Sequence, residues 1–280
     1  MIAAPRSPSF DELALLLSDR DIRILERLEQ FRLLDTRLIQ RLEFPVGEGG
    51  QHASSAAATR ATTRVLGRLE SHGCLDRVGR RVGGTERGSS QTIWQLGATG
   101  ERFLRARRGD TSRRRYVTPS HAFLAHTLAV ASYAARLTEL ARVTGFELLA
   151  LGTEPDSWRR FQTASGPQIL KPDLTAITAD ADHETHSFIE IDRSTEHLPA
   201  VLRKCHAYQA YWQSGAEQAS QGLFPTVIWV TLDAARTKSI KTAIAGDHQL
   251  DSHLFHVATA EPSLAVVAPY TSLISKGGTP

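Results

Sequence analysis

Apolar residues at helical spacing fill three consecutive segments near the start of this chain, and this pattern limits what its first hundred residues can form. The first segment begins at Ser18 with an S-x-x-D capping pattern and runs through Phe31. The second follows Asp35, a predicted N-cap, and stops before Pro45, and the third covers residues 56–73. The apolar face of the third helix is predicted to comprise Ala61, Val65 and Leu69.

Two short strands and one more helix are predicted directly after the three helices. Residues 74–84 and 89–97 have strand-like composition and are joined through Gly, Ser and Arg, and residues 98–108 return to helical spacing. Three helices followed by a β-ribbon are typical of a winged helix-turn-helix domain. We therefore predict such a domain over residues 18–108, after an N-terminal tail of residues 1–17.

Arginines gather on the two parts of this domain that would meet DNA. Those on the third helix recur every four residues, and the others belong to the loop of the ribbon: Arg60, Arg64 and Arg68, then Arg80, Arg81 and Arg87. Residues 1–116 contain 21 Arg, no Lys and 14 acidic residues, a balance of +7 within a net charge of +3 for the chain. Because a basic surface suits a polyanion, we predict binding of double-stranded DNA. The alternative is a protein-interaction module whose charged stripe is only solvated.

Composition narrows the remaining classes of protein. We find no run of about eighteen uncharged apolar residues and no basic signal-peptide start, so we expect a soluble, cytoplasmic protein with no membrane partner. Cys74 and Cys205 lie far apart with no CxxC pattern. Neither a disulfide framework nor a structural zinc site is indicated, and both residues are expected to be buried thiols.

A basic linker, residues 109–118, leads to a second region over residues 119–270, and residues 271–280 form a C-terminal tail. The region opens with a long helix over residues 121–145. Strands are predicted at residues 146–151, 170–178, 186–192, 225–232 and 253–259, and further helices at 196–214 and 235–246. The fold class of the chain is therefore predicted to be α/β (α+β).

Acidic residues fall on the second and third of these strands. Pro172-Asp173 stands on one, and Glu190 and Asp192 stand two residues apart on the next, where they would share a face. This order of elements and acids resembles the PD-(D/E)XK nucleases and implies a restriction-endonuclease-like three-layer α/β domain. Asp173, Glu190 and Asp192 are predicted to bind Mg²⁺, with Mn²⁺ as a substitute, because phosphodiester hydrolysis needs a metal that neutralises charge and activates water.

The pattern departs from those nucleases at one position. Where they carry a lysine, this chain has Asp192, which cannot supply a positive charge. Lys171, on the strand of Asp173, and Lys204, on the following helix, are the candidate substitutes. Tyr208 shares a helix face with Lys204, and we interpret it first as a core residue. The alternative for both lysines is that they only balance buried carboxylates.

Five segments together resemble the replication-relaxation family of bacterial plasmids and integrated elements. They are residues 18–44, 64–78, 121–130, 171–177 and 188–211. The resemblance covers most of residues 18–232, and it implies a winged helix fused to a domain related to the restriction-endonuclease fold, with a role in plasmid replication, DNA relaxation or transfer. The positions that match the motifs are His126, Asp173, Glu190, Asp192, Lys204 and Tyr208.

Two functions remain open at this point, besides a toxin-like or defence nuclease, which would share the chemistry of the first but differ in its biology. The first is a DNA-binding protein whose second domain is a Mg²⁺-dependent endonuclease or nickase, assisted by Lys204 or Lys171. The second is a non-enzymatic regulator or replication accessory, whose inactive nuclease-like domain serves dimerisation or partner binding. Double-stranded DNA is the expected partner in both, together with replication or transfer proteins and a second copy of the chain in a homodimer.

Overall fold

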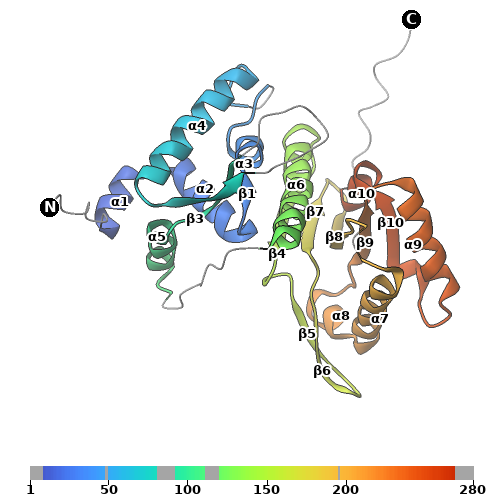
Figure 1. The fold of residues 1–280 in the computed structure, drawn as a ribbon. Coiled ribbons are helices and arrows are strands. Elements are labelled where there is room, and N and C mark those ends of the chain that lie inside the picture. The colour runs from blue at the N-terminus through green and yellow to red at the C-terminus, as the bar shows by residue number, and fades with distance from the viewer. Residues whose placement is uncertain (1–8, 48–49, 81–91, 111–119, 195, 269–280) are drawn as a thin grey trace, which may run out of the picture. The chain divides into compact units, whose positions relative to one another are not determined.

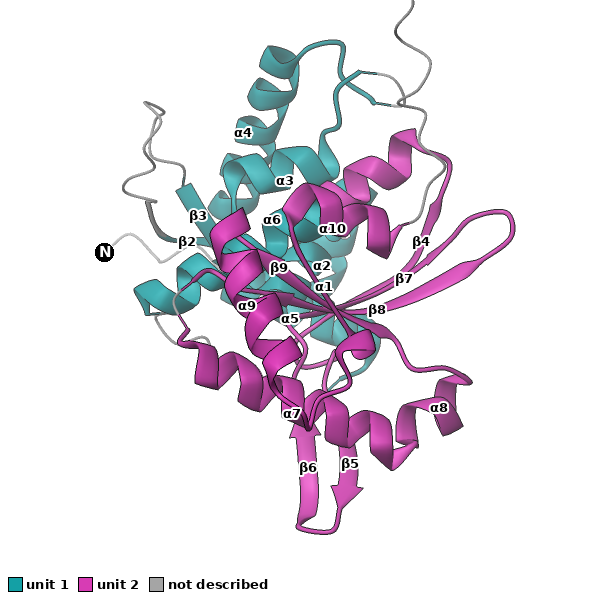
Figure 2. Ribbon diagram, turned by 90° about the vertical axis from the view of Figure 1, so that its right-hand side faces the viewer, with its two compact units in different colours: residues 1–135 teal, residues 136–280 magenta. Residues whose placement is uncertain are grey.

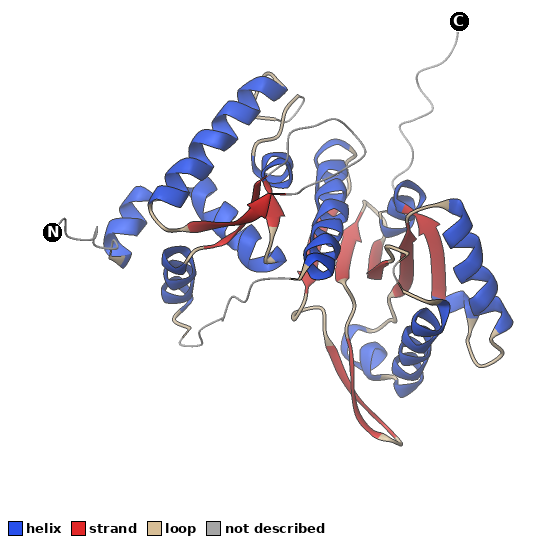
Figure 3. Cartoon of the chain, viewed as in Figure 1, coloured by secondary structure: helices blue, strands red, loops and turns tan. Residues whose placement is uncertain are grey.

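The structure, a computed structural model, divides the chain into two compact units, residues 1–135 and 136–280 (Figure 2). The residues that it describes are 9–47, 50–80, 92–110, 120–194 and 196–268. Both units contain helices and strands (Figure 3), so the predicted α/β class is confirmed. The division falls inside helix α6 (His121–Val143). Of the helices in the described ranges, none combines the length and the apolar character that crossing a membrane requires.

Between residues 18 and 108, unit 1 contains three helices, a β-ribbon and a further helix in the predicted order. Its elements before α6 are α1 (Phe10–Leu16), α2 (Asp19–Phe31), β1 (Leu34–Asp35), α3 (Thr36–Glu43), α4 (Ser55–Ser71), β2 (Leu75–Arg80), β3 (Thr92–Leu96) and α5 (Ala98–Arg108). Strands β2 and β3 are antiparallel, and β1 pairs with the other edge of β3. The helices predicted between residues 18 and 108 are confirmed.

Both predicted N-caps of this unit are present. The Ser18 side chain accepts a hydrogen bond from the backbone N–H of Asp21, and the Asp21 carboxylate accepts one in return from the N–H of Ser18 at 2.8 Å. The Asp35 carboxylate accepts a hydrogen bond from the N–H of Leu38 at 2.8 Å. These side chains satisfy backbone donors that the first helical turn leaves unpaired, and so fix where α2 and α3 begin.

The apolar face predicted for the third helix is wrong by about one residue. On α4 the buried side chains are Ala58, Thr62, Leu66 and Leu69, whereas Ala61 and Val65 are only half-buried. A threonine can occupy the buried face because its hydroxyl donates a hydrogen bond to the Ala58 carbonyl at 2.8 Å, which removes the cost of burying it.

Helix α1 lies within the residues that the sequence assigns to a tail. A capping box joins Ser9 and Glu12 at its start, Leu13 is 1% exposed, and Phe10 stacks on Phe103 of α5 with ring centroids 5.3 Å apart. One buried leucine per seven residues gives too weak a periodicity for sequence reasoning to find this helix.

Unit 2 is built on a five-stranded sheet. After the last turns of α6 its elements are β4 (Glu147–Thr153), β5 (Arg159–Thr163), β6 (Gly166–Leu170), β7 (Leu174–Ala179), β8 (Glu184–Ile191), α7 (Leu198–Ser214), α8 (Ala216–Gln221), β9 (Thr226–Thr231), α9 (Ala234–Gly246), a 3₁₀ turn (Ser252–Leu254), β10 (Phe255–Thr259) and α10 (Ala260–Val267). The sheet order is β10-β9-β8-β7-β4 (Figure 1). Strands β4, β7 and β8 are antiparallel neighbours, while β9 and β10 run parallel to β8, as their helical crossovers require.

Helices cover both faces of this sheet. On one face α7 and α9 pack against Phe188, Val227 and Trp229 in a buried core. Thr175 is the register partner of Phe188 and lies on the same face. Because successive residues of a strand point to opposite faces, Thr178, three residues later, points to the other face. There its hydroxyl donates a hydrogen bond to the Val267 carbonyl of α10. Unit 2 therefore has helix, sheet and helix layers.

Three parts of unit 2 have no counterpart in the sequence-based prediction: the hairpin β5–β6, α8 and α10. The hairpin also changes one predicted strand. Residues 170–178 are not a single strand, because Leu170 ends β6 and β7 begins only at Leu174. Pro172 has no N–H to donate to a strand ladder, and residues 171–173 accordingly form a connection.

Candidate functional site

Asp173 lies beside the end of β8, although it precedes a different strand. Strands β7 and β8 are antiparallel with Leu174 opposite Ile189, so the residue before β7 reaches the last residues of β8. The Asp173 Oδ2 atom accepts a hydrogen bond from the backbone N–H of Ile191 at 2.8 Å, and the side chain is 12% exposed. Its carboxylate is thus fixed at the carboxyl end of β8, next to Glu190.

Lys204 joins the two carboxylates from helix α7. Its Nζ atom donates to Oε2 of Glu190 and lies 3.9 Å from Oδ1 of Asp173. Tyr208, one helical turn further on, donates its hydroxyl to Oε1 of Glu190. Tyr208 is completely buried, which confirms its assignment to the core. We call Asp173, Glu190, Lys204 and Tyr208 the carboxylate cluster.

Burial and charge act against each other in this cluster. Burial raises the pKa of the Glu190 carboxyl to about 8, against the opposing charge of Lys204 and with the like charge of Asp173 adding. Burial lowers the pKa of Lys204, but the charges of Glu190 and Asp173 outweigh it and hold the pKa above its usual value. Lys204 is therefore charged at neutral pH, and Glu190 is the group that gains or loses a proton.

Lys204→Met is expected to destabilise the protein most at high pH. Removing the ammonium raises the pKa of Glu190 above about 8, further from its value in the unfolded chain. The folded protein then keeps a proton that the unfolded chain releases, and the stability that comes from this proton is lost as pH rises through the folded-state pKa. The loss relative to the unchanged protein should grow by about 1.4 kcal/mol per pH unit above pH 8, as measured by urea unfolding at fixed pH.

Two further variants isolate this proton. Lys238→Met removes an exposed lysine of α9 and should cost little at any pH. Lys204→Met/Glu190→Gln has no carboxyl left to titrate at position 190, so its loss of stability relative to the unchanged protein should not grow between pH 8 and about pH 10. A Lys204→Met loss that stayed constant as the pH rose would contradict the coupling between the two residues.

Asp192, the third predicted metal ligand, pairs with a different residue. Its carboxylate accepts two hydrogen bonds from the Arg236 guanidinium of α9, at 2.6 and 3.0 Å, and its side chain is buried. This bidentate pair already balances its charge. The expected cluster of three carboxylates is not found: within the described ranges no group of three or more His, Cys, Asp or Glu residues is placed to hold a metal ion.

Lys171 contacts an aromatic ring instead of the carboxylates. Its Nζ atom lies 4.3 Å from the centroid of the Trp158 ring, a cation–π contact. The prediction that Lys171 lies on one strand with Asp173 is wrong, because the strand is interrupted at Pro172. His126, another predicted position, is half-buried on α6.

The arginines predicted to contact DNA differ in their surroundings. Arg60 and Arg64 lie on the exposed face of α4, and within the described residues neither has an ion-pair partner. Arg68 instead donates two hydrogen bonds to the fully buried Asp21 carboxylate, at 2.6 and 2.7 Å. The ribbon-loop residues Arg81 and Arg87 lie outside the described residues, as does the side chain of Arg80.

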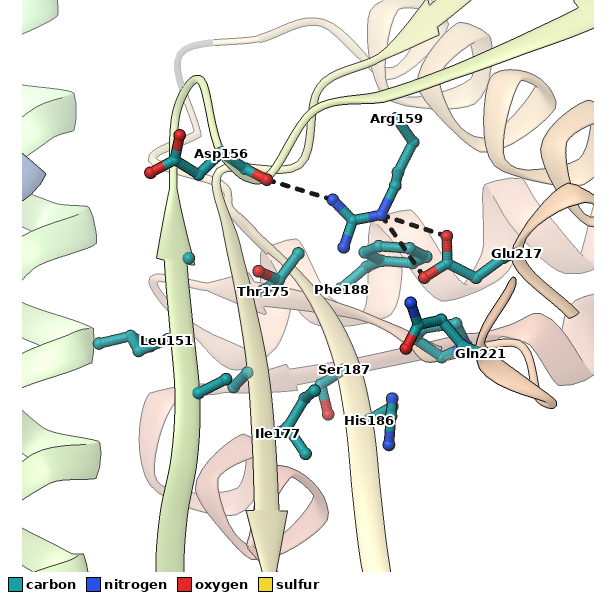
Figure 4. Close-up of a pocket in the computed structure, with 14 residues that line it drawn as sticks. Leu151, Asp156, Arg159, Thr175, Ile177, His186, Ser187, Phe188, Glu217 and Gln221 are labelled. Atoms are coloured by element: carbon teal, nitrogen blue, oxygen red, sulfur yellow. Dashed lines mark hydrogen bonds and ion pairs between the residues drawn. The ribbon is translucent and has the colours of Figure 1, made fainter. Parts of the chain in front are cut away.

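A pocket of about 280 Å³ opens nearer the start of β8 (Figure 4). Thr175, His186 and Phe188 line it from the sheet, and Arg159 and Glu217 form an ion pair at 3.1 Å beside them. None of the residues that line the pocket belongs to the carboxylate cluster, so the pocket and the cluster are separate features of unit 2.

A family model described as replication-relaxation matches residues 25–227. The matched range includes α4 and all four residues of the carboxylate cluster. No curated protein and no solved structure matches the chain.

Proposed function

Because this chain belongs to the replication-relaxation family, we propose that it binds double-stranded DNA through unit 1 and cleaves or nicks it with Mg²⁺ in unit 2. The process would be replication, relaxation or transfer of a plasmid or mobile element. One observation carries the proposal: Asp173, Glu190 and Lys204 meet at the end of β8. The family supplies the link to replication and relaxation, and the cluster supplies the chemistry.

The residues of the cluster suit a magnesium-assisted hydrolysis. Asp173 and Glu190 offer oxygen ligands, and Mg²⁺ is commonly held by one or two carboxylates together with waters and substrate phosphates. A bound Mg²⁺ would neutralise the charge that develops on the phosphodiester and acidify a bound water. Lys204 provides the positive charge that the PD-(D/E)XK pattern lacks at position 192, from a helix instead of the strand. It would orient the attacking water or hold a phosphate oxygen.

Unit 1 offers the surface for the duplex. The order α2, α3, α4 and ribbon β2–β3 is that of a winged helix, in which the third helix enters the major groove. Along the exposed face of α4 lie Thr59, Arg60, Thr63 and Arg64. The two arginines provide cations for phosphates and base edges, whereas the two threonine hydroxyls already donate to backbone carbonyls of the helix.

A second function is favoured by a different observation. Both oxygens of Glu190 already accept hydrogen bonds, from Lys204 and Tyr208, and Asp192 is neutralised by Arg236. A protein that used this domain only for dimerisation or partner binding would keep such pairs, because removing one member leaves a buried charge. The alternative is therefore a DNA-binding accessory of replication with no cleavage activity.

The two functions are separated by incubating the purified full chain with supercoiled plasmid DNA. We expect a gel shift with or without metal, and nicked or linear product only with Mg²⁺ or Mn²⁺ and not with EDTA. A shift without any cleavage would favour the accessory function. A protein that shifts no duplex DNA would rule out both.

A further inference from the structure

We infer that the hairpin β5–β6 is a second DNA contact, a two-stranded ribbon that lies against the duplex beside the carboxylate cluster. The inference rests on the proposed function and adds to it the element of unit 2 that would hold the DNA near Asp173.

The base of the hairpin is tied to the cluster. Strand β6 ends at Leu170, three residues before Asp173, and the Ser157 hydroxyl at the entrance to β5 donates a hydrogen bond to the Pro172 carbonyl at 2.6 Å. DNA bound at the base of the hairpin would therefore lie near the Asp173 carboxylate of the cluster.

Buried residues and an ion pair hold the base rigid. Phe161 and Leu170 belong to the core between the sheet and α7. Arg159 pairs with the buried Glu217 of α8 at 3.1 Å and also donates to the Asp156 carbonyl at 3.3 Å (Figure 4). Since a two-stranded hairpin alone is marginally stable in water, these contacts explain how it stays ordered outside the sheet.

The two faces of the hairpin differ in burial. Phe161 and Leu170 point from one face into the core, and side chains on the other face alternate with them. On that other face Arg160 stands opposite Ile169, and Gln162 opposite Pro167, and all four side chains are exposed. Figure 1 shows the hairpin as a separate ribbon that projects away from the five-stranded sheet. This face is therefore open to a partner.

Charge and shape favour DNA as that partner. Residues 157–171 contain no acidic residue, within a unit that carries 12 basic and 16 acidic residues. Arg159 is already balanced by Glu217, so the charge that the hairpin adds comes from Arg160 and Lys171. A two-stranded ribbon fits the major groove of B-DNA. On the open face Arg160 suits a phosphate, Gln162 suits a base edge, and Ile169, which is 43% exposed, suits a thymine methyl group.

Crosslinking tests this contact without depending on cleavage. The natural thiols, Cys74 and Cys205, are buried, and burial raises their pKa values to about 11 and about 12, so an added exposed cysteine is modified selectively. We would attach a benzophenone to Gln162→Cys and, as the matched control, to Lys238→Cys on α9, and irradiate each with duplex DNA. The hairpin position should crosslink to DNA several-fold more than the α9 position.

Each outcome has a defined meaning. If the labelled chain still shifts duplex DNA but the hairpin position crosslinks no more than the control, or crosslinks to a second copy of the chain, the inference is overturned and the proposed function stands. A chain that shifts no DNA overturns both.

Salt dependence gives a second measurement. Arg160→Ala should reduce the slope of log affinity against log salt by about 0.9, the value for one lost phosphate contact, while Lys238→Ala should leave the slope unchanged. An unchanged slope for Arg160→Ala would remove the phosphate contact from the proposal.

Discussion

Asp173→Asn is expected to lower metal-dependent DNA cleavage by about 10³-fold, because the several kcal/mol that a bound metal contributes to phosphoryl chemistry require its carboxylate ligands. Asparagine has the same size, and its side-chain oxygen can still accept the hydrogen bond from the Ile191 N–H, which Asp173 accepts at 2.8 Å. The substitution therefore removes one charge with little change of shape. Cleavage of supercoiled DNA and a gel shift, measured on the same preparation, separate chemistry from binding.

The control is Asp182→Asn, which removes an exposed carboxylate from the turn between β7 and β8. It should cleave and bind DNA like the unchanged protein. Lys204→Met should lose cleavage together with Asp173→Asn, since the cluster acts as a unit. Full cleavage by Asp173→Asn would refute a catalytic role for the cluster, whatever the family implies.

The elements of this fold follow largely from local signals. The caps at Ser18 and Asp35 and the apolar periodicity of α2 and α3 are determined within a few residues, and the structure confirms them. Helix α1 has a capping box at Ser9 and Glu12, but it is too short for an apolar periodicity, and the hairpin β5–β6 has only two buried side chains, Phe161 and Leu170. Short elements held by distant contacts are where local reasoning fails.

The carboxylate cluster was predictable only in part. The pairing of β7 with β8 brings Asp173 close to Glu190. Two lysines lie near these acidic residues in the sequence, and in the structure it is Lys204 that pairs with them. What decides between the lysines is Pro172, which breaks the strand and lets Lys171 turn to Trp158. The pairing of Asp192 with Arg236 joins residues 44 positions apart and leaves no trace in local spacing. For that reason the predicted group of three carboxylates is not found among the described residues.

The second large effect is expected for substitutions of the arginines of α4. Replacing Arg68 should affect folding, whereas replacing Arg64 should affect DNA binding. Arg68→Ala should destabilise unit 1 by about 3 kcal/mol, because it leaves a buried carboxylate without its charged partner. Asp21 is fully buried and its two oxygens accept hydrogen bonds from Arg68 at 2.6 and 2.7 Å. The effect lies at the lower end for such pairs because Arg68 itself is 42% exposed. Urea unfolding measures it.

Arg64→Ala, four residues earlier on the same exposed face, is the matched variant. Arg64 has no ion-pair partner within the described residues, so its loss should change stability by less than about 0.5 kcal/mol. It should instead weaken DNA binding and reduce the salt slope by about 0.9. Asp21→Asn/Arg68→Ala, which leaves no charge buried, should recover part of the lost stability. If Arg68→Ala kept full stability but lost DNA affinity, the three arginines would act as one DNA-contacting stripe. If Arg68→Ala instead loses stability while Arg64→Ala loses only DNA affinity, the four-residue repeat has two roles. Arg60 and Arg64 face the solvent, and Arg68 holds α4 against the start of α2.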